Sequence, residues 1–367
     1  MEILSGIIFV FLLIQLTVAI SNARIPIPRA PAKVTDGPSL SILIPARNEE
    51  KNLPYLLQDL LQQEIPPLEI LVCDDHSSDR TYLEASCLAA IHPVIRVFKG
   101  EKLPPGWLGK NFACEQLAHK ARGNYLLFLD ADVRIGAKAI APILSEAIRL
   151  KTGLLSVFPR QSMLSPGEKS TVPLMTYILL TLLPLSLVYK IAGQSALAAA
   201  NGQFMMFEAT AYRQVQPHRI KRHEAVEDIA IARLYKKSGY RVACLTGLPD
   251  ISCRMYTGRR EAIRGFARSI AGFFGGSLVL AFLFWLLTCW GWLPVLVAFS
   301  WPGLILYLGL RSVVRLLVAR KACQSPAVNL RWSIPQQYNF AFILLKALQS
   351  RISKKMIWKD RNILNPQ

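Results

Sequence analysis

The sequence predicts an α/β fold, with a sheet in the middle of the chain and apolar helices at both ends. Short apolar strands alternate with helical segments between residues 39 and 250, which is the pattern of βαβ units. Two of these strands are followed by pairs of acidic residues, and ligands of open α/β sheets bind at the carboxyl ends of strands. Long apolar segments at residues 3–20 and 273–310 enclose this region.

Composition and charge indicate a chain that works beside a membrane. The 367 residues are 52% hydrophobic, with a mean hydropathy of +0.30 and a net charge of +19. A basic and apolar chain suits an anionic membrane surface. Nucleic acid is disfavoured as a partner, because the positive charge lies beside the apolar segments and increases towards the C-terminus. The seven cysteines lack the spacing of zinc or redox motifs, which indicates a reduced, cytosolic core.

The first apolar segment, residues 3–20, is long enough to cross a bilayer. Arg24, Arg29 and Lys33 follow it, and no basic residue precedes it. The positive-inside rule therefore places the N-terminus outside and the chain after the segment in the cytoplasm. Ser21-Asn22-Ala23 resembles a signal-peptidase site, but the lack of a basic start favours an uncleaved anchor.

Acidic residues follow the first two strands of the predicted α/β region. The loop after the first strand contains Pro45 and Glu49, and the second strand ends in Asp74 and Asp75. Neighbouring parallel strands place their carboxyl ends at one edge of a sheet, so these loops should lie together. His76 follows where a turn needs a positive φ, which histidine tolerates, and we interpret it as a turn residue. Strands are expected over residues 40–44, 69–72, 94–98 and 242–245, and helices over 53–63, 111–122 and 227–238.

The central strand covers residues 125–129 and runs directly into Asp130 and Asp132. Five apolar residues in a row predict a fully buried strand. Along an extended backbone both carboxylates would point to the same side. Two carboxylates at a strand end suit a divalent cation that also holds a diphosphate. The alternative is that Asp132 caps a helix over residues 135–150.

Two further charged positions have both a catalytic and a structural interpretation. Lys110 lies near a helix N-terminus, where it would add positive charge to an anion site or lie exposed on the surface. Glu227-Asp228 begins a predicted helix that ends in Lys236 and Lys237, so acidic residues in its first turn stabilise it. An ionised aspartate there could also take a proton from an acceptor hydroxyl, and both roles can hold at once.

These residues together resemble the inverting family 2 glycosyltransferases, which have the GT-A fold. The resemblance extends from about residue 39 to 250, with the motifs in the family's order. The motifs are Ile-Pro-Ala-Arg-Asn-Glu-Glu from residue 44, Asp-Asp-His-Ser-Ser-Asp-Arg-Thr from residue 74, Gly-Lys-Asn from residue 109, Leu-Asp-Ala-Asp from residue 129, Asn-Gly-Gln-Phe from residue 201 and Val-Glu-Asp-Ile-Ala from residue 226.

The resemblance implies a role for each matched residue. Asp228 would be the catalytic base, Lys110 would face the diphosphate, and Asp132 would bind the metal, which is Mg²⁺ or Mn²⁺. Asp130 would touch the nucleotide sugar or the metal. Pro45, Glu49, Asp74 and Asp75 would line the nucleotide pocket, with one of the two aspartates holding the base.

The later apolar segments set the expected topology. A span at residues 172–192 would separate Asp130 from Asp228, so this segment should lie in the membrane interface or dip into the membrane and out again. The alternative is a core helix. The apolar hairpin over 271–312 turns at a tryptophan pair, which suits the far interface. The expected parts are an anchor (1–22), a proline-rich linker (23–38), a catalytic domain (39–270), the hairpin (271–312) and a basic interfacial region (313–367).

Two motifs narrow the expected activity. Polymer-forming members of the family carry Gln-x-x-Arg-Trp where this chain has residues 264–268 without the Gln or the Trp, so a single transfer is expected. Arg268 itself would contact diphosphate or lipid headgroups. Trp358-Lys359-Asp360-Arg361 resembles a Trp-Lys-Gly-Arg near the end of bacterial carotenoid glycosyltransferases.

We therefore expect a multi-pass protein of the cytoplasmic membrane with a cytoplasmic catalytic domain. It would transfer one hexose from a nucleotide sugar, UDP-glucose, to a lipid hydroxyl such as that of a carotenoid. The alternatives are a polyprenyl-phosphate sugar synthase, another glycolipid synthase, or a non-catalytic membrane scaffold. Pocket shape decides the sugar and the acceptor, and the sequence does not give it.

Overall fold

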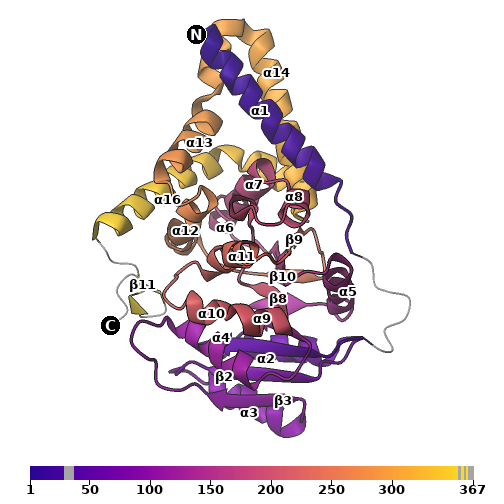
Figure 1. Ribbon diagram of the computed structural model, residues 1–367. Coiled ribbons are helices and arrows are strands. Elements are labelled where there is room, and N and C mark those ends of the chain that lie inside the picture. The colour runs from indigo at the N-terminus through magenta and orange to yellow at the C-terminus, as the bar shows by residue number, and fades with distance from the viewer. Residues whose placement is uncertain (29–36, 354–356, 359–360, 363–367) are drawn as a thin grey trace. The chain divides into compact units, whose positions relative to one another are not determined.

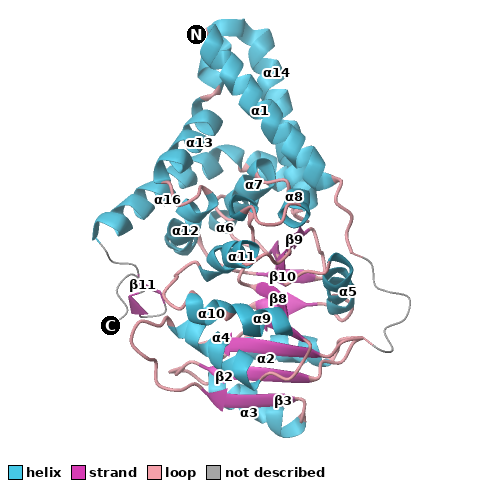
Figure 2. Ribbon diagram, viewed as in Figure 1, coloured by secondary structure: helices cyan, strands magenta, loops and turns pink. Residues whose placement is uncertain are grey.

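The computed structural model describes residues 1–28, 37–353, 357–358 and 361–362. The chain forms two compact units (Figure 1), and each unit combines segments that are separate in the sequence. The first unit contains Met1–Pro26, Gln161–Leu187 and Met255–Met356, and the second contains Ile27–Arg160, Val188–Arg254 and Ile357–Gln367. The sequence placed a single catalytic domain over residues 39–270. In the structure, residues 161–187 and 255–270 of that range belong to the first, helical unit (Figure 2).

The second unit is organised around a seven-stranded sheet of order β3-β2-β1-β4-β8-β6-β9. Strands β1 to β4 run parallel to one another, as do β6 and β9, whereas β8 runs antiparallel to β4 and β6. The sheet is therefore mixed, as the resemblance to the GT-A fold implies. Its strands are β1 (Leu40–Ala46), β2 (Glu69–Asp74), β3 (Ile95–Lys99), β4 (Tyr125–Leu129), β6 (Leu154–Phe158), β8 (Phe204–Glu208) and β9 (Val242–Thr246).

The centre of this sheet is apolar on both faces, which is why its strands are continuous hydrophobic runs. Ile42, Leu43 and Ile44 of β1 are fully buried, and so are Leu126 and Leu127 of the neighbouring β4. Burial of this kind is worth roughly 1.5–3 kcal/mol for each large side chain. The predicted bounds of the strands at 40, 69, 94, 125 and 242 are within two residues of the observed ones.

A close backbone contact fixes the entry into β4. A Cβ atom on Gly123 would lie 2.6 Å from the backbone nitrogen of Ser41, so only glycine fits there. The Gly123 N–H donates to Ser41 Oγ at 2.9 Å, and that hydroxyl donates to Glu69 Oε1 at 2.8 Å. These contacts hold the start of β4 against β1 and β2, and so set the position of the residues that follow β4.

Helices and a small sheet complete the second unit. Strand β5 (Val133–Ile135) pairs antiparallel with β10 (Ile251–Cys253), which places Cys253 opposite Val133. Helices α2, α4 and α11 have bounds within two residues of the predicted ones. The helices are α2 (Leu53–Leu61), α3 (Thr81–Ile91), α4 (Gly109–Lys120), α5 (Ile140–Leu150), η1 (Ser195–Leu197), α9 (Ala209–Val215), α10 (Pro217–Ile220) and α11 (Glu227–Lys237), and the remaining short strands are β7 (Arg160–Gln161), β11 (Ile357–Trp358) and β12 (Arg361–Asn362).

The alternative interpretation of Asp132 as a helix cap is wrong. Helix α5 begins at Ile140 with Ala139 at its N-cap, and strand β5 lies between Asp132 and that helix. Residues 135–139, which the sequence assigned to the helix, therefore belong to the end of β5 and a turn. The pairing of β5 with β10 overrides the helical pattern at this point.

The first unit is helical. Its helices are α1 (Glu2–Ala23), α6 (Pro166–Lys169), α7 (Pro173–Leu182), α12 (Arg259–Phe273), α13 (Leu278–Trp290), α14 (Trp292–Lys321), α15 (Pro326–Arg331) and α16 (Ser333–Ser353), and α8 (Leu185–Lys190) lies where the chain enters the second unit. Among the residues that the structure describes, two helical stretches are long and apolar enough to cross a membrane, namely Glu2–Ala23 and the joined α13 and α14. Within α14 the helix is interrupted at Ser300, where φ is 53°, two residues before Pro302.

The apolar segment at residues 172–192 is two helices, not one. Pro184 separates α7 from α8, and Asn22 of α1 satisfies the backbone groups left open there. Its Nδ2 donates to the carbonyls of Leu180 and Leu183, and its Oδ1 accepts from the N–H of Leu185. Nearly every residue of α7 is buried within the first unit, which agrees with the alternative of a core helix.

Helix α16 buries amide side chains beside apolar ones and leaves a row of large apolar side chains exposed. Gln336, Gln337 and Asn339 are buried, and Asn339 Nδ2 donates to the carbonyl oxygen of Ser170 at 2.8 Å. Large apolar side chains lie exposed on the same helix at intervals of three or four residues, which places them on one face. They are Ile334, Tyr338, Phe342, Leu345, Leu348 and Ile352.

Candidate functional site

Three elements of the second unit bring together a lysine and two carboxylates. Lys110 lies in the first turn of α4, Asp130 directly follows β4, and Glu227 is the first residue of α11. Lys110 Nζ lies 2.8 Å from Asp130 Oδ1 and 2.9 Å from Glu227 Oε1. The surface-lysine interpretation of Lys110 is therefore wrong, because its ammonium group joins two motifs that are nearly 100 residues apart in the chain.

The charges in this cluster stabilise one another. Burial opposes the charge on Lys110, but Asp130 and Glu227 outweigh it and raise the Lys110 pKa well above its usual value. Burial would likewise raise the pKa of Glu227, yet the adjacent Lys110 ammonium lowers it overall. Lys110 and Glu227 are therefore both ionised at neutral pH.

Asp228 points to a different partner from its neighbour Glu227. Its Oδ2 accepts from the Gly202 N–H at 3.0 Å, and its Oδ1 accepts from the Ile229 N–H at 2.7 Å. Burial, followed by the charge of Glu227, raises the pKa of Asp228 to about 7. A carboxyl group with a pKa near neutral pH is suited to proton transfer.

Gly202 has no side chain, which leaves space for the charged groups of this cluster. A Cβ atom there would lie 3.2 Å from both Glu227 Oε1 and Lys110 Nζ. The loop before β8 therefore lies against the charged groups, and its N–H orients Asp228. The Asn-Gly-Gln-Phe motif was recognised in the sequence, but no role could be assigned to Gly202 without its contacts.

Asp132 has the environment of a metal ligand. Its Oδ1 is buried and has no hydrogen-bond partner, although the Cys253 thiol hydrogen-bonds its carboxylate. Burial raises the pKa of Asp132 to about 7, and the charges of Asp130 and Glu49 add to this effect. A buried carboxylate oxygen without a partner is costly unless a cation or proton compensates it.

The two carboxylates after β4 are neighbours, but not for the reason that the sequence suggested. Strand β4 ends at Leu129, and the chain turns at Ala131 and Asp132, so the side chains do not alternate along an extended backbone. Asp130 instead pairs with Lys110, whereas Asp132 points towards Cys253, whose Sγ accepts from Gln203 Nε2 at 2.8 Å. Nothing in the sequence pattern indicated Cys253.

The donor set fits a divalent cation that is only partly coordinated by protein. No three His, Cys, Asp or Glu side chains within the described ranges gather closely enough to hold a metal by themselves. Magnesium is commonly bound by one or two carboxylates together with substrate phosphates. Asp132, with its unpartnered oxygen, and the adjacent Asp130 match that arrangement.

The loops after β1 and β2 are tied together by hydrogen bonds. The Glu49 N–H donates to Thr81 Oγ1 at 2.7 Å, and Arg47 Nη1 donates to the carbonyl oxygen of Asp75 at 2.7 Å. His76 has a φ of 53°, which confirms its interpretation as a turn residue. The structure therefore places the predicted pocket residues of the two strands on adjoining loops, as expected from the sheet edge.

Asp74 is the buried member of the predicted aspartate pair. It ends β2 with only 3% of its surface exposed, and its Oδ2 accepts from the Ser77 N–H at 3.4 Å. Its Oδ1 is buried without a hydrogen-bond partner. Pro45 precedes this edge as the sixth residue of β1, in register with Cys73. Which of the two aspartates would contact a bound base stays a prediction.

Comparisons with known proteins show which protein family this part of the chain matches. The sequence model described as "Glycosyl transferase family 2" matches residues 41–213. These residues are a family 2 glycosyltransferase domain. The region contains every predicted site residue of the second unit except Asp228.

The chain is similar to glycosyltransferases of known acceptor. It is 28% identical over 260 residues to the 4,4'-diaponeurosporenoate glycosyltransferase of Staphylococcus haemolyticus, covering 68% of this chain and 67% of that protein. It is 27% identical over 254 residues to the enzyme of the same description from Staphylococcus aureus strain MRSA252, covering 68% and 66%. The chain thus spans about two thirds of the length of these relatives.

Solved structures support the fold of the glycosyltransferase. A mannosyltransferase from Pyrobaculum calidifontis, in complex with GDP-Man and Mn2+, superposes with a TM-score of 0.59 at 17% identity, covering 95% of this chain and 98% of that one. The GT-A fold expected from the motifs is therefore confirmed, with its seven-stranded mixed sheet. Arg268 lies on α12 in the first unit, and its contact with diphosphate or lipid stays a prediction.

Removing the Lys110 ammonium tests whether it holds the glycosyltransferase cluster together. We expect Lys110→Met to lower the free energy of unfolding by about 1–3 kcal/mol, because Asp130 and Glu227 would then repel each other in a partly buried site. Thermal unfolding of the purified protein measures this. The double variant Lys110→Met, Glu227→Gln should recover part of the loss, and an unchanged melting temperature in the single variant would contradict the interpretation.

Proposed function

We propose that this chain is a membrane-bound inverting glycosyltransferase that transfers one hexose from a nucleotide sugar to the polar end of a long apolar lipid. The observation that carries the proposal is the gathering of Lys110, Asp130, Asp132 and Asp228 at one sheet edge. Single transfer is favoured because the Gln-x-x-Arg-Trp motif of polymer-forming relatives is missing. UDP-glucose is the proposed donor and a carotenoid the proposed acceptor.

Donor binding is assigned to the loops after β1, β2 and β4. Asp74 would accept a hydrogen bond from the base, with Pro45, Glu49 and Asp75 around it, and Lys110 would face the diphosphate. Asp130 and Asp132 would hold Mg²⁺ or Mn²⁺, which when bound neutralises charge on the departing diphosphate. Lys110 supplies further positive charge on the same side.

The transfer step is assigned to Asp228. The oxygen of the acceptor hydroxyl forms a bond to the anomeric carbon as the bond from that carbon to the diphosphate breaks on the opposite face. Asp228 takes the hydroxyl proton, and the Gly202 N–H keeps its carboxylate oriented. Attack from the side opposite the leaving group inverts the anomeric centre.

A carboxylate acceptor is the second candidate, and the relatives favour it. Their description names diaponeurosporenoate, a carotenoid acid, as the acceptor. A carboxylate is already ionised at neutral pH, so its attack needs no general base. The product would be a sugar ester in place of a glycoside, and the role of Asp228 separates the two candidates.

The first unit is the proposed membrane part. Helix α1 and the joined α13 and α14 are long enough to span, and their exposed side chains are mostly apolar. The row of exposed apolar side chains on α16, together with its buried amides, supports contact with lipid hydrocarbon. The positive flanks at Arg24 and Arg320 favour a cytoplasmic second unit at the inner membrane.

Mass spectrometry of lipid extracts tests the activity. Cells that carry the gene should contain a hexosylated apolar lipid that cells without it lack, and the Asp228→Asn gene serves as the matched control. The mass difference gives the sugar, and alkaline hydrolysis distinguishes an ester from a glycoside. An identical lipid profile in all three strains would overturn the proposal.

The topology is tested by labelling from outside the cell. Lys138 is exposed on the second unit, and its ion pair with Glu64 contributes little because both side chains face water. We expect Lys138→Cys, placed in a background in which Cys87, Cys289 and Cys323 are replaced by serine, to react with a membrane-impermeant maleimide only after the cells are permeabilised. Labelling in intact cells would place the second unit outside and contradict the topology.

A further inference from the structure

Two arginines lie one helical turn apart on α14 in the first unit, Arg315 buried and Arg311 half-buried. Arg315 has only 4% of its surface exposed, and its guanidinium lies over the ring of Tyr177, 5.0 Å from the ring centre. Its Nη1 donates to Gln336 Oε1 at 2.7 Å, whereas Nε and Nη2 are buried without hydrogen-bond partners. Arg311, four residues earlier on α14, hydrogen-bonds Tyr307.

Neither arginine has a carboxylate partner among the residues that the structure describes. The segments of the first unit contain three carboxylates, Glu2, Glu168 and Glu261. Glu168 caps helix α6, and Glu261 accepts from Thr257. A buried guanidinium without a counter-charge is costly, so the compensating anion is expected to come from outside the chain.

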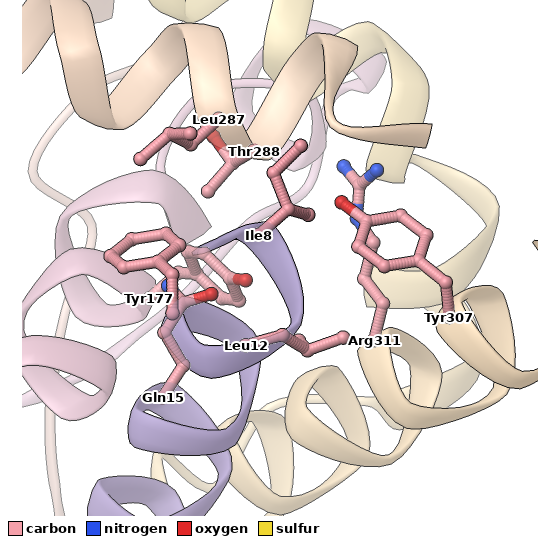
Figure 3. Close-up of a pocket in the computed structure, with 9 residues that line it drawn as sticks. Ile8, Leu12, Gln15, Tyr177, Leu287, Thr288, Tyr307 and Arg311 are labelled. Atoms are coloured by element: carbon pink, nitrogen blue, oxygen red, sulfur yellow. The ribbon is translucent and has the colours of Figure 1, made fainter. Parts of the chain in front are cut away.

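A small pocket lies beside Arg311, which is one of its lining residues (Figure 3). Arg311, Tyr307, Thr288, Tyr177 and Gln15 supply its polar groups, and side chains of α1 and α13 supply its apolar wall. Gln15 is 2% exposed, and its Nε2 has no hydrogen-bond partner. The pocket has room for about one water molecule, and therefore for one oxygen atom of a larger anion.

Tyr177 connects the pocket to the second arginine. Its side chain lines the pocket, and its ring carries the Arg315 guanidinium. An anionic oxygen in the pocket would thus meet the guanidinium of Arg311 and the open amide donor of Gln15, with the buried charge of Arg315 close by. Both guanidinium groups and the amide are donors, which selects an acceptor group with negative charge.

We propose that this pocket binds the phosphate of an anionic phospholipid, with one phosphate oxygen seated between Arg311 and Gln15. The proposal rests on the membrane position proposed for the first unit. The lipid's acyl chains would lie along the apolar helices that surround the pocket, whose exposed side chains include Leu13 and Leu308. The glycosyltransferase then holds a resident lipid that is neither its donor nor its acceptor.

The test measures lipid binding by the full-length protein in detergent, with native mass spectrometry and thermal unfolding. Phosphatidylglycerol, phosphatidylcholine and inorganic phosphate are the probes. Phosphatidylglycerol should bind and raise the melting temperature, and the other two should not. The variants are Arg311→Gln and Gln15→Leu, and Arg320→Gln is the matched control, because it removes an exposed charge from the same helix.

Arg311→Gln should weaken phosphatidylglycerol binding about tenfold, which is the usual effect of losing one charge-assisted hydrogen bond. Arg320→Gln should bind as the wild type does. Arg315→Met should keep or raise the lipid-free melting temperature, because it removes a charge that lacks a partner, and should lose the stabilisation by phosphatidylglycerol.

Three results would overturn the proposal: equal affinity for phosphatidylcholine, equal stabilisation by inorganic phosphate, or unchanged phosphatidylglycerol binding in Arg311→Gln. The proposed function is measured separately on the same samples, by sugar transfer and by flotation with phosphatidylcholine vesicles. If the first unit does not bind membranes, the protein will not float with the vesicles. If only the phosphate site is wrong, flotation will be intact and only the preference for phosphatidylglycerol will be missing.

Discussion

Replacing Asp228 with asparagine is expected to lower sugar transfer to a hydroxyl acceptor by roughly two to four orders of magnitude, the usual contribution of a general base. Asparagine keeps the size of the side chain and can still accept from the Gly202 N–H. Donor affinity should survive, because the nucleotide and metal contacts are assigned to other residues. Transfer to lipid and donor binding are measured together in the purified variant.

The pH dependence of the wild-type enzyme provides a second measurement. Burial and Glu227 raise the pKa of Asp228 to about 7, so a base role requires transfer to fall as the pH drops below about 7. Glu224→Gln is the matched control, because Glu224 pairs with Lys221 at 3.6 Å near the surface and should not affect turnover. Normal transfer by a folded Asp228→Asn enzyme would end the base assignment and favour the carboxylate acceptor.

Asp132→Ala is expected to abolish divalent-dependent binding of the nucleotide sugar. Loss of even an outer-shell group lowers metal affinity 10–100-fold, so losing a direct ligand should cost at least about a hundredfold. Titration calorimetry with UDP-glucose, with and without Mn²⁺, measures the change. Binding that depends on the metal as it does in the wild type would remove Asp132 from the site.

The same variant should not be less stable than the wild type when no metal is present. Asp132 Oδ1 is buried without a partner, so its removal relieves an uncompensated polar group. Asp250→Asn is the control, since Asp250 is an exposed acid of the same unit and should change neither metal-dependent binding nor stability. A large drop in melting temperature for Asp132→Ala would mean that the residue is structural.

Much of the α/β unit followed from local patterns in the sequence. The run from Tyr125 to Leu129 matches the observed bounds of β4, since five apolar residues between turn signals are too short for a buried helix and fit a buried strand. Acidic residues at the ends of β2 and β4 located the edge of the sheet where the site lies. The motif order then gave the family, because each motif falls on a strand end or a helix start.

The contacts within the site could not be predicted in the same way. Lys110 joins Asp130 to Glu227 across a large sequence separation, and no spacing rule encodes such a pairing. Cys253 reaches Asp132 because β10 pairs with β5, a three-residue strand that the helical pattern of residues 135–150 concealed. The long-range pairing of β5 with β10 therefore explains both errors: the helix start predicted too early and the role of Cys253 that was not recognised.

The position of β8 in the sheet has a consequence for folding during synthesis, because β4 is made well before the strand that pairs with it. Strand β4 pairs with β1 on one side and with β8 on the other, and residues 161–187 of the helical unit separate β4 from β8 in the chain. A ribosome needs roughly 4 to 15 seconds to add the intervening residues at 5–20 residues per second. During that time the β4 edge is uncovered, and an uncovered edge strand invites pairing with other chains. Biogenesis must therefore accommodate the helical segment before the catalytic sheet can close, and a chain truncated at both ends to residues 27–254 would still carry residues 161–187 of the helical unit.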